Sequence, residues 1–86
     1  MHDGSADSRT RLAIEAIAGY LARWPDAADT EQGIARWWLP RMGVELPLAD
    51  VRSALDRLVQ SKAMARTSLP EGSVIYRAAE PAPRPH

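Results

Sequence analysis

Residues 48–77 constrain the fold of this chain more than any other stretch. Apolar residues first recur at helical spacing and then follow the pattern of two short strands separated by a turn. In the turn, Pro70 supplies a fixed φ and Gly72 permits a positive φ. The apolar helical positions are Leu48, Val51, Leu55, Leu58 and Val59. We therefore expect a helix over residues 48–62 that leads into an antiparallel hairpin with strands at 64–69 and 74–77.

Two further helices are expected ahead of this stretch. The first covers residues 8–23 and carries one apolar stripe. The second begins at Glu31, with Asp29 and Gln32 as its capping box, and ends at Pro40 because proline interrupts a helix. The predicted fold class is therefore mainly α with a small β-hairpin, built from three helices.

The length of the chain allows one small domain. Its 86 residues are 45% hydrophobic, which is enough for one compact core. We expect a disordered N-terminal arm over residues 1–7, the folded domain over 8–79 and a disordered proline-rich tail over 80–86. The sequence has no run of about 18 apolar residues, no secretory pattern at its start and no cysteine. A cytoplasmic protein without membrane contact is expected.

The sequence offers little material for catalysis. Its two histidines, His2 and His86, both lie in the segments expected to be disordered, whereas a general base or a metal site needs ligands in fixed positions. No nucleophile–base pattern, glycine-rich phosphate loop or zinc-ligand spacing is present. We expect no enzyme activity, cofactor, metal or small-molecule substrate.

The segment over residues 46–76 resembles the second half of winged helix-turn-helix domains. The matching features are the apolar pattern of the third helix, Met64-Ala65-Arg66, the turn with Pro70 and Gly72, and Val74-Ile75-Tyr76-Arg77. With the two preceding helices, the resemblance covers residues 9–79 and implies a three-helix core plus a wing. That superfamily includes DNA readers, protein adapters and subunit-docking modules.

In the DNA-binding members of that superfamily, the third helix enters the major groove and the wing touches the adjacent backbone. The resemblance therefore implies a transcriptional regulator that binds double-stranded DNA. The residues expected to contact DNA are Arg52, Ser53, Arg57, Arg66 and Arg77. Residues 47–77 hold five basic and three acidic side chains, so this half of the chain is the positive one.

Charge also supports a second function. The net charge is zero, whereas proteins that bind nucleic acids usually carry a basic excess. Asp50 and Asp56 are expected on the same outward face as the arginines, and Glu71 lies at the tip of the expected wing. Carboxylates at these places would repel phosphate. A protein-interaction adapter without DNA binding is therefore the alternative.

Two adjacent tryptophans, Trp37 and Trp38, are the candidate residues for a protein interface. Neighbouring residues on a helix point about 100° apart, so both rings cannot be centred on one narrow buried stripe. An exposed tryptophan is a typical anchor at protein interfaces. The partner of such an adapter is either another protein or a second copy of the chain.

Overall fold

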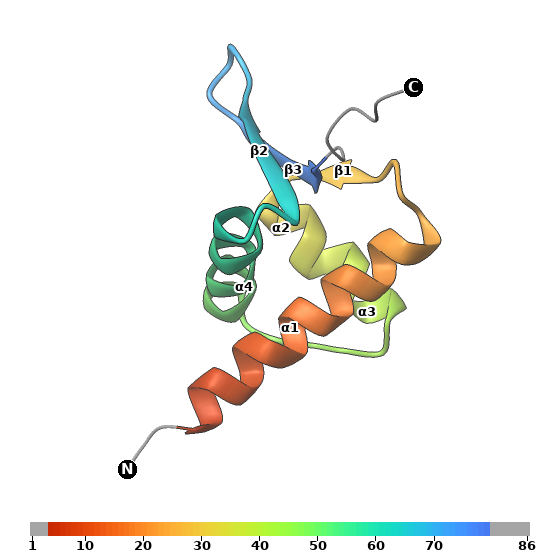
Figure 1. The fold of residues 1–86 in the computed structure, drawn as a ribbon, viewed down its shortest axis with the longest axis vertical. Coiled ribbons are helices and arrows are strands. Elements are labelled where there is room, and N and C mark those ends of the chain that lie inside the picture. The colour runs from red at the N-terminus through yellow and green to blue at the C-terminus, as the bar shows by residue number, and fades with distance from the viewer. Residues whose placement is uncertain (1–3, 80–86) are drawn as a thin grey trace, which may run out of the picture.

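The computed structural model describes residues 4–79 and shows three helical segments and a three-stranded antiparallel sheet (Figure 1). The first and last helical segments are α1 (Gly4–Arg23) and α4 (Leu48–Gln60). The segment between them is continuous and consists of α2 (Glu31–Gly33), η1 (Ile34–Trp38) and α3 (Leu39–Arg41). The strands are β1 (Ala28–Asp29), β2 (Met64–Ser68) and β3 (Val74–Ala78). The predicted fold class, mainly α with a small β-hairpin, is confirmed in the number and order of the helical segments and in the presence of the hairpin.

The hairpin forms close to its expected position. β2 and β3 pair antiparallel from Met64 opposite Ala78 to Ser68 opposite Val74, and Gly72 in the connecting turn has a φ of 102°. The sequence did not predict β1, which adds two residues to the free edge of β3 and gives the strand order β1-β3-β2. A two-residue strand carries no periodic pattern, so it depends on the neighbouring strand rather than on its own sequence.

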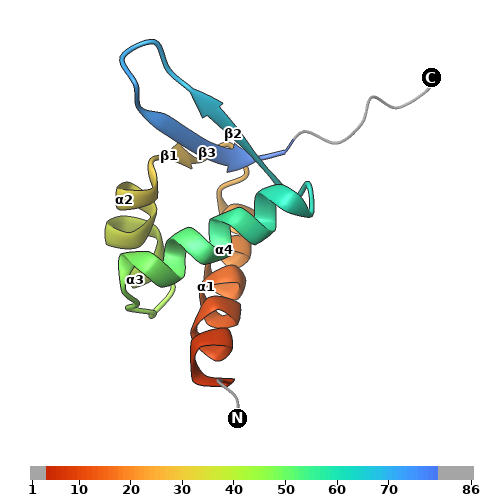
Figure 2. The same ribbon diagram turned by 90° about the vertical axis from the view of Figure 1, so that its left-hand side faces the viewer.

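The helices pack around one core, and the hairpin projects away from them. α4 crosses α1, and the turn of the hairpin extends beyond the helices at the end opposite to the start of α1 (Figures 1 and 2). All three helical segments and the inner ends of β2 and β3 contribute to the core. The core residues are Ala13, Ala16, Ile17, Tyr20, Ile34, Trp38, Leu39, Val51, Ala54, Leu55, Leu58, Met64 and Tyr76.

α1 begins earlier than the sequence pattern indicates. Residues 4–7, expected in the N-terminal arm, belong to the helix in the structure. Asp7 lies in the first turn, where a carboxylate suits the helix dipole, and it accepts a hydrogen bond from Arg11 at 3.0 Å. The remainder of the expected arm, residues 1–3, and the expected tail, residues 80–86, lie outside the described residues.

The second helical segment does not end at Pro40, as the sequence predicted, but continues to Arg41. η1 is a π-helix, and the backbone N–H of Leu39 donates to the carbonyl of Ile34, five residues earlier. A proline ring inside a regular α-helix clashes with the carbonyl four residues before it. The wider π turn directly before Pro40 relieves this clash, so the helical path continues.

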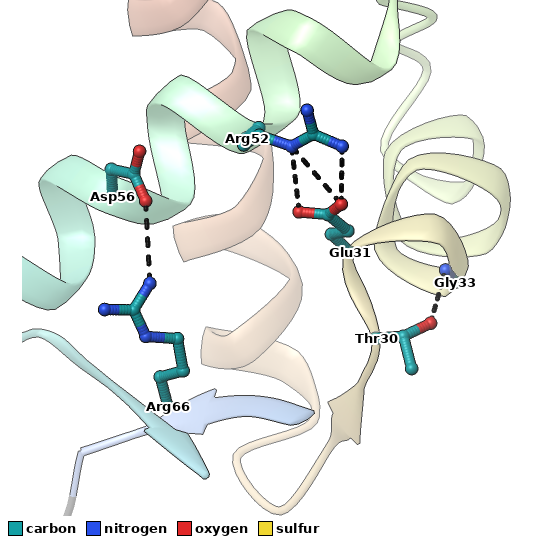
Figure 3. A network of polar contacts seen from close by, with 6 residues as sticks. All are labelled: Thr30, Glu31, Gly33, Arg52, Asp56 and Arg66. Carbon is teal, nitrogen blue, oxygen red and sulfur yellow. Dashed lines mark hydrogen bonds and ion pairs between the residues drawn. The ribbon is translucent and has the colours of Figure 1, made fainter. Parts of the chain in front are cut away.

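The N-cap of this segment is Thr30 rather than Asp29. The Thr30 hydroxyl accepts a hydrogen bond from the backbone N–H of Gly33 at 3.1 Å (Figure 3). Asp29 instead accepts from the backbone N–H of Thr30 at 2.8 Å, and its carboxylate occupies the space that a side chain at Gly33 would need. The predicted capping box is therefore wrong by one residue, although the predicted start at Glu31 is confirmed.

The two adjacent tryptophans have different environments. Trp38 is 3% exposed, and its ring stacks on Tyr20 of α1 with 4.5 Å between ring centroids and 10° between planes. Trp37 is 57% exposed. The prediction that one of the two rings would be exposed is confirmed, and the structure identifies it as Trp37.

This difference predicts opposite results for two neighbouring substitutions. Trp38→Ala should lower the free energy of unfolding by about 3–5 kcal/mol, because it removes a large buried ring and leaves a cavity. Trp37→Ala should change it by no more than about 0.5 kcal/mol, because this ring is largely in water. Urea denaturation followed by far-UV circular dichroism measures both values. Similar losses in the two variants would contradict the assignment of core and surface.

Candidate functional site

The first candidate site is the outward face of α4 with the adjoining hairpin. Arg52, Ser53 and Arg57 are exposed on α4, while Arg66 on β2 and Arg77 on β3 are exposed on the sheet. The structure therefore places all five predicted DNA contacts at the surface. Whether these side chains can bind phosphate depends on the charged groups that lie next to them.

Arg52 is held by a carboxylate from the preceding helical segment. Its Nη2 donates to Glu31 at 2.7 Å, and its Nε lies 3.2 and 3.3 Å from the two carboxylate oxygens (Figure 3). The hydrogen bonds and the charge of Glu31 raise the pKa of Arg52 above its ordinary value. This two-pronged pair links α4 to the start of α2 and occupies the guanidinium edge that would face DNA.

The other arginines of this face also meet carboxylates. Arg57 donates to Asp7 of α1 at 3.1 Å, and Arg66 lies 3.8 Å from Asp56 (the latter pair in Figure 3). Arg52, Arg57 and Arg66 are therefore each already paired with an acid. Together with Ser53, they form a surface of alternating charge rather than a basic one.

One expected surface residue of α4 is not on the surface. Asp50 was predicted to face outward with the arginines, but its side chain is 12% exposed and accepts a hydrogen bond from Arg9 of α1 at 3.1 Å. Ala54, four residues further along α4, is fully buried in the core. The prediction for Asp50 is wrong because α1 packs against this side of α4.

The second candidate site lies at the end of α1 and along η1 and α3. We call it the Arg–Trp surface, and it consists of Arg23, Trp24, Arg36, Trp37 and Arg41. Trp24 is 41% exposed, with the guanidinium carbons of Arg23 and Arg41 at 5.7 and 5.9 Å from the centroid of its ring. The guanidinium of Arg36 lies 5.9 Å from the ring of Trp37.

An open groove adjoins the Arg–Trp surface. Its volume is about 480 Å³, and Arg36 belongs both to its lining and to the Arg–Trp surface. The lining residues are Ala35, Arg36, Pro40, Glu45, Leu46 and Pro47. Four of the six lining residues are apolar and the other two are a cation and a carboxylate, so the groove offers both apolar and polar atoms to a ligand.

Sequence reasoning identified only one residue of the Arg–Trp surface, Trp37. It placed Trp24 on the apolar stripe of the first helix and did not single out Arg23, Arg36 or Arg41. The repeated Arg-Trp dipeptide, at 23–24 and 36–37, was the available signal. Trp38, the other predicted interface residue, is buried in the core and is not accessible to a partner.

Two further findings concern the described part of the chain. Residues 4–79 contain no group of three metal-ligating side chains, and none of their helices has the length and apolarity needed to cross a bilayer. Comparisons of the chain with models of protein families, with curated proteins and with solved structures gave no match. The function is therefore argued from the two surfaces.

The ion pair between Asp7 and Arg57 predicts a pH dependence of stability. The hydrogen bond and charge of Arg57 lower the pKa of Asp7 below its ordinary value of 3.8. A carboxyl group with a lowered folded-state pKa stabilises the fold above its unfolded-state pKa, and this contribution disappears as the pH falls through the folded-state value. Asp7→Asn should therefore be less stable than the unmodified chain at neutral pH, and the difference should shrink below about pH 4.

Urea midpoints measured between about pH 2 and pH 7 test this dependence. Arg57→Gln is the matched variant, because it removes the partner and should reduce the same pH dependence while Asp7 is retained. A difference between Asp7→Asn and the unmodified chain that stays constant over the whole range would contradict the assigned role of the pair.

Proposed function

We propose that this chain is a non-enzymatic binding module of the winged-helix type whose partner is a protein. The observation that carries the proposal is the uneven distribution of paired and unpaired arginines. Within residues 4–79, the arginines of α4 are paired with carboxylates, whereas Arg23, Arg36 and Arg41 form no ion pair. The unpaired cations lie beside the exposed rings of Trp24 and Trp37.

The order of elements supports the winged-helix class. Three helical segments precede a β-hairpin, and the last of them, α4, leads directly into β2 (Figure 2). A two-residue strand between the first and second helical segments pairs with the hairpin. The resemblance drawn from residues 46–76 implies this arrangement, in which the third helix and the hairpin lie side by side.

The composition of the Arg–Trp surface favours a protein partner. Tryptophan and arginine are enriched among the residues that dominate binding energy at protein interfaces. Trp37 and Trp24 keep large parts of their rings in water. Removing the exposed part of one such ring from water contributes on the order of 2 kcal/mol to binding. Trp37 is therefore the proposed central contact, and Trp24 extends the surface.

DNA binding through α4 is the second candidate function. It is favoured by the exposed positions of Arg52, Ser53 and Arg57 on a helix that adjoins the hairpin. Exposed ion pairs are weak, so a DNA phosphate can replace the carboxylate partner of an arginine. The acids that pair with these arginines would then stand against the same phosphates, which is why this function ranks second.

Site-specific photo-crosslinking in cells that produce the chain naturally separates the two functions. A photoreactive amino acid replaces Trp37 in one variant and Ser53 in the other, so the two probes report on the Arg–Trp surface and on α4. We expect a covalent protein adduct from position 37 and none from position 53. A DNA adduct from position 53, with no protein adduct from position 37, would overturn the proposal.

A titration with mixed-sequence duplex DNA tests the second candidate directly. Amide shifts are mapped at low and moderate salt, and the proposal expects no salt-sensitive shifts in residues 49–60 or in the hairpin. If α4 does bind DNA, about four phosphate contacts would give a log–log salt slope of about −3 to −4. Shifts of this kind that disappear in Arg52→Gln/Arg57→Gln would establish DNA binding instead.

A further inference from the structure

We infer that the Arg–Trp surface binds an acidic protein segment that also inserts an apolar side chain into the adjoining groove. This inference rests on the proposed function and adds the chemistry of the partner. It depends on three features of the described residues: available cations, a path that connects them, and a groove at one end of that path with four apolar residues in its lining.

The cations of the Arg–Trp surface are available for a carboxylate from outside the domain. Arg23, Arg36 and Arg41 each stack near a tryptophan ring and form no ion pair within residues 4–79. A guanidinium beside an aromatic ring keeps its N–H edge free for hydrogen bonds to a carboxylate. Five other arginines already pair with acids, and these are Arg9, Arg11, Arg52, Arg57 and Arg66.

Two groups of contacts, joined by helical spacing, place these residues along one strip. Arg41 lies against Trp24, which connects α3 to the end of α1. Trp37 and Arg41 are four residues apart in the same helical segment and therefore lie on the same side of it. Arg36 lies against Trp37 and also lines the groove, so the strip ends at the groove.

The groove makes the proposed site selective for a partner that carries an apolar side chain as well as acidic residues. Its apolar lining residues, Ala35, Pro40, Leu46 and Pro47, suit an aliphatic or aromatic side chain. Glu45 is the carboxylate among the lining residues, so the acidic part of a bound segment is expected to point away from it, toward Arg41 and Trp24. Asp26, two residues after Trp24, is exposed and forms no ion pair with these arginines.

The same features disfavour two other occupants. A twofold contact between copies of this surface would bring six arginines together, and none of the five residues that define the surface is an acid that could neutralise them. Single-stranded nucleic acid could stack bases on the tryptophans and pair phosphates with the arginines, but it has no flexible aliphatic side chain of the size of leucine to fill the groove. A protein segment with carboxylates and an apolar side chain matches the available cations, the strip that connects them and the groove at its end.

Synthetic peptides test the inference on the full chain. The first peptide carries two leucines among several glutamates, the second has glutamine in place of glutamate, and the third has serine in place of leucine. A single-stranded oligothymidine of similar length is the fourth ligand. Because the peptides contain no tryptophan, the fluorescence of the protein reports binding, and isothermal titration calorimetry confirms the affinity.

We expect the acidic leucine peptide to bind and each of the two altered peptides to bind about tenfold more weakly. The variant Arg23→Gln/Arg36→Gln/Arg41→Gln should lose a similar factor for the acidic peptide. Arg52→Gln/Arg57→Gln is the matched control, because it removes cations from α4 and should leave the affinity unchanged. Circular dichroism verifies that both variants keep their helical content.

Three outcomes would overturn the inference. The first is that the acidic leucine peptide does not bind at millimolar concentration. The second is that the glutamine peptide binds as tightly as the acidic peptide. The third is that oligothymidine binds more tightly than the acidic peptide and loses affinity in the variant that lacks the three arginines. If the crosslink from position 37 yields a protein adduct while the peptides fail, the proposed function stands and only the acidic partner is wrong. If that crosslink yields no protein, the proposed function itself fails.

Discussion

The packing of α1 against α4 is the constraint on which both surfaces depend. Each helix contributes a fully buried alanine to the core, Ala13 and Ala54, and small side chains allow two helices to approach closely. The start of α1 then supplies Asp7 to an arginine of α4, whereas its end places Trp24 beside Arg41 of α3. α1 therefore supplies one of the acids that neutralise the first surface and helps to build the second.

The distribution of ion pairs, rather than the number of charges, distinguishes the two surfaces. The chain has equal numbers of acidic and basic residues, which counts against a DNA partner but does not indicate the surface that a protein would contact. In the folded chain, Glu31, Asp7 and Asp56 lie against the arginines of α4 and β2. Within residues 4–79, no acid forms an ion pair with the three arginines of the Arg–Trp surface, so the proposed protein contact lies there.

The second helical segment serves both the core and the Arg–Trp surface. Its π turn, η1, contains both tryptophans, of which Trp38 stacks on Tyr20 in the core while Trp37 is largely in water. The segment continues through Pro40 to Arg41, which lies beside Trp24. This one segment therefore carries part of the aromatic stack of the core and three residues of the Arg–Trp surface.

The sequence by itself determined the elements whose signals are local. The helical period over residues 48–60 and the Pro70–Gly72 turn predicted α4 and the hairpin to within two residues, because side-chain periodicity and turn chemistry depend on neighbouring residues alone. The same reasoning showed that Trp37 and Trp38 could not both be centred on one narrow buried stripe.

Only the tertiary structure decided which charges meet. Asp50 became buried and Arg57 found Asp7 fifty positions away, because helix packing brought distant segments together. The strand β1 and the passage of the helix through Pro40 likewise required partners or hydrogen bonds that no periodic pattern reveals. Periodicity reports the face on which a residue lies, but pairing depends on the segment that lies opposite.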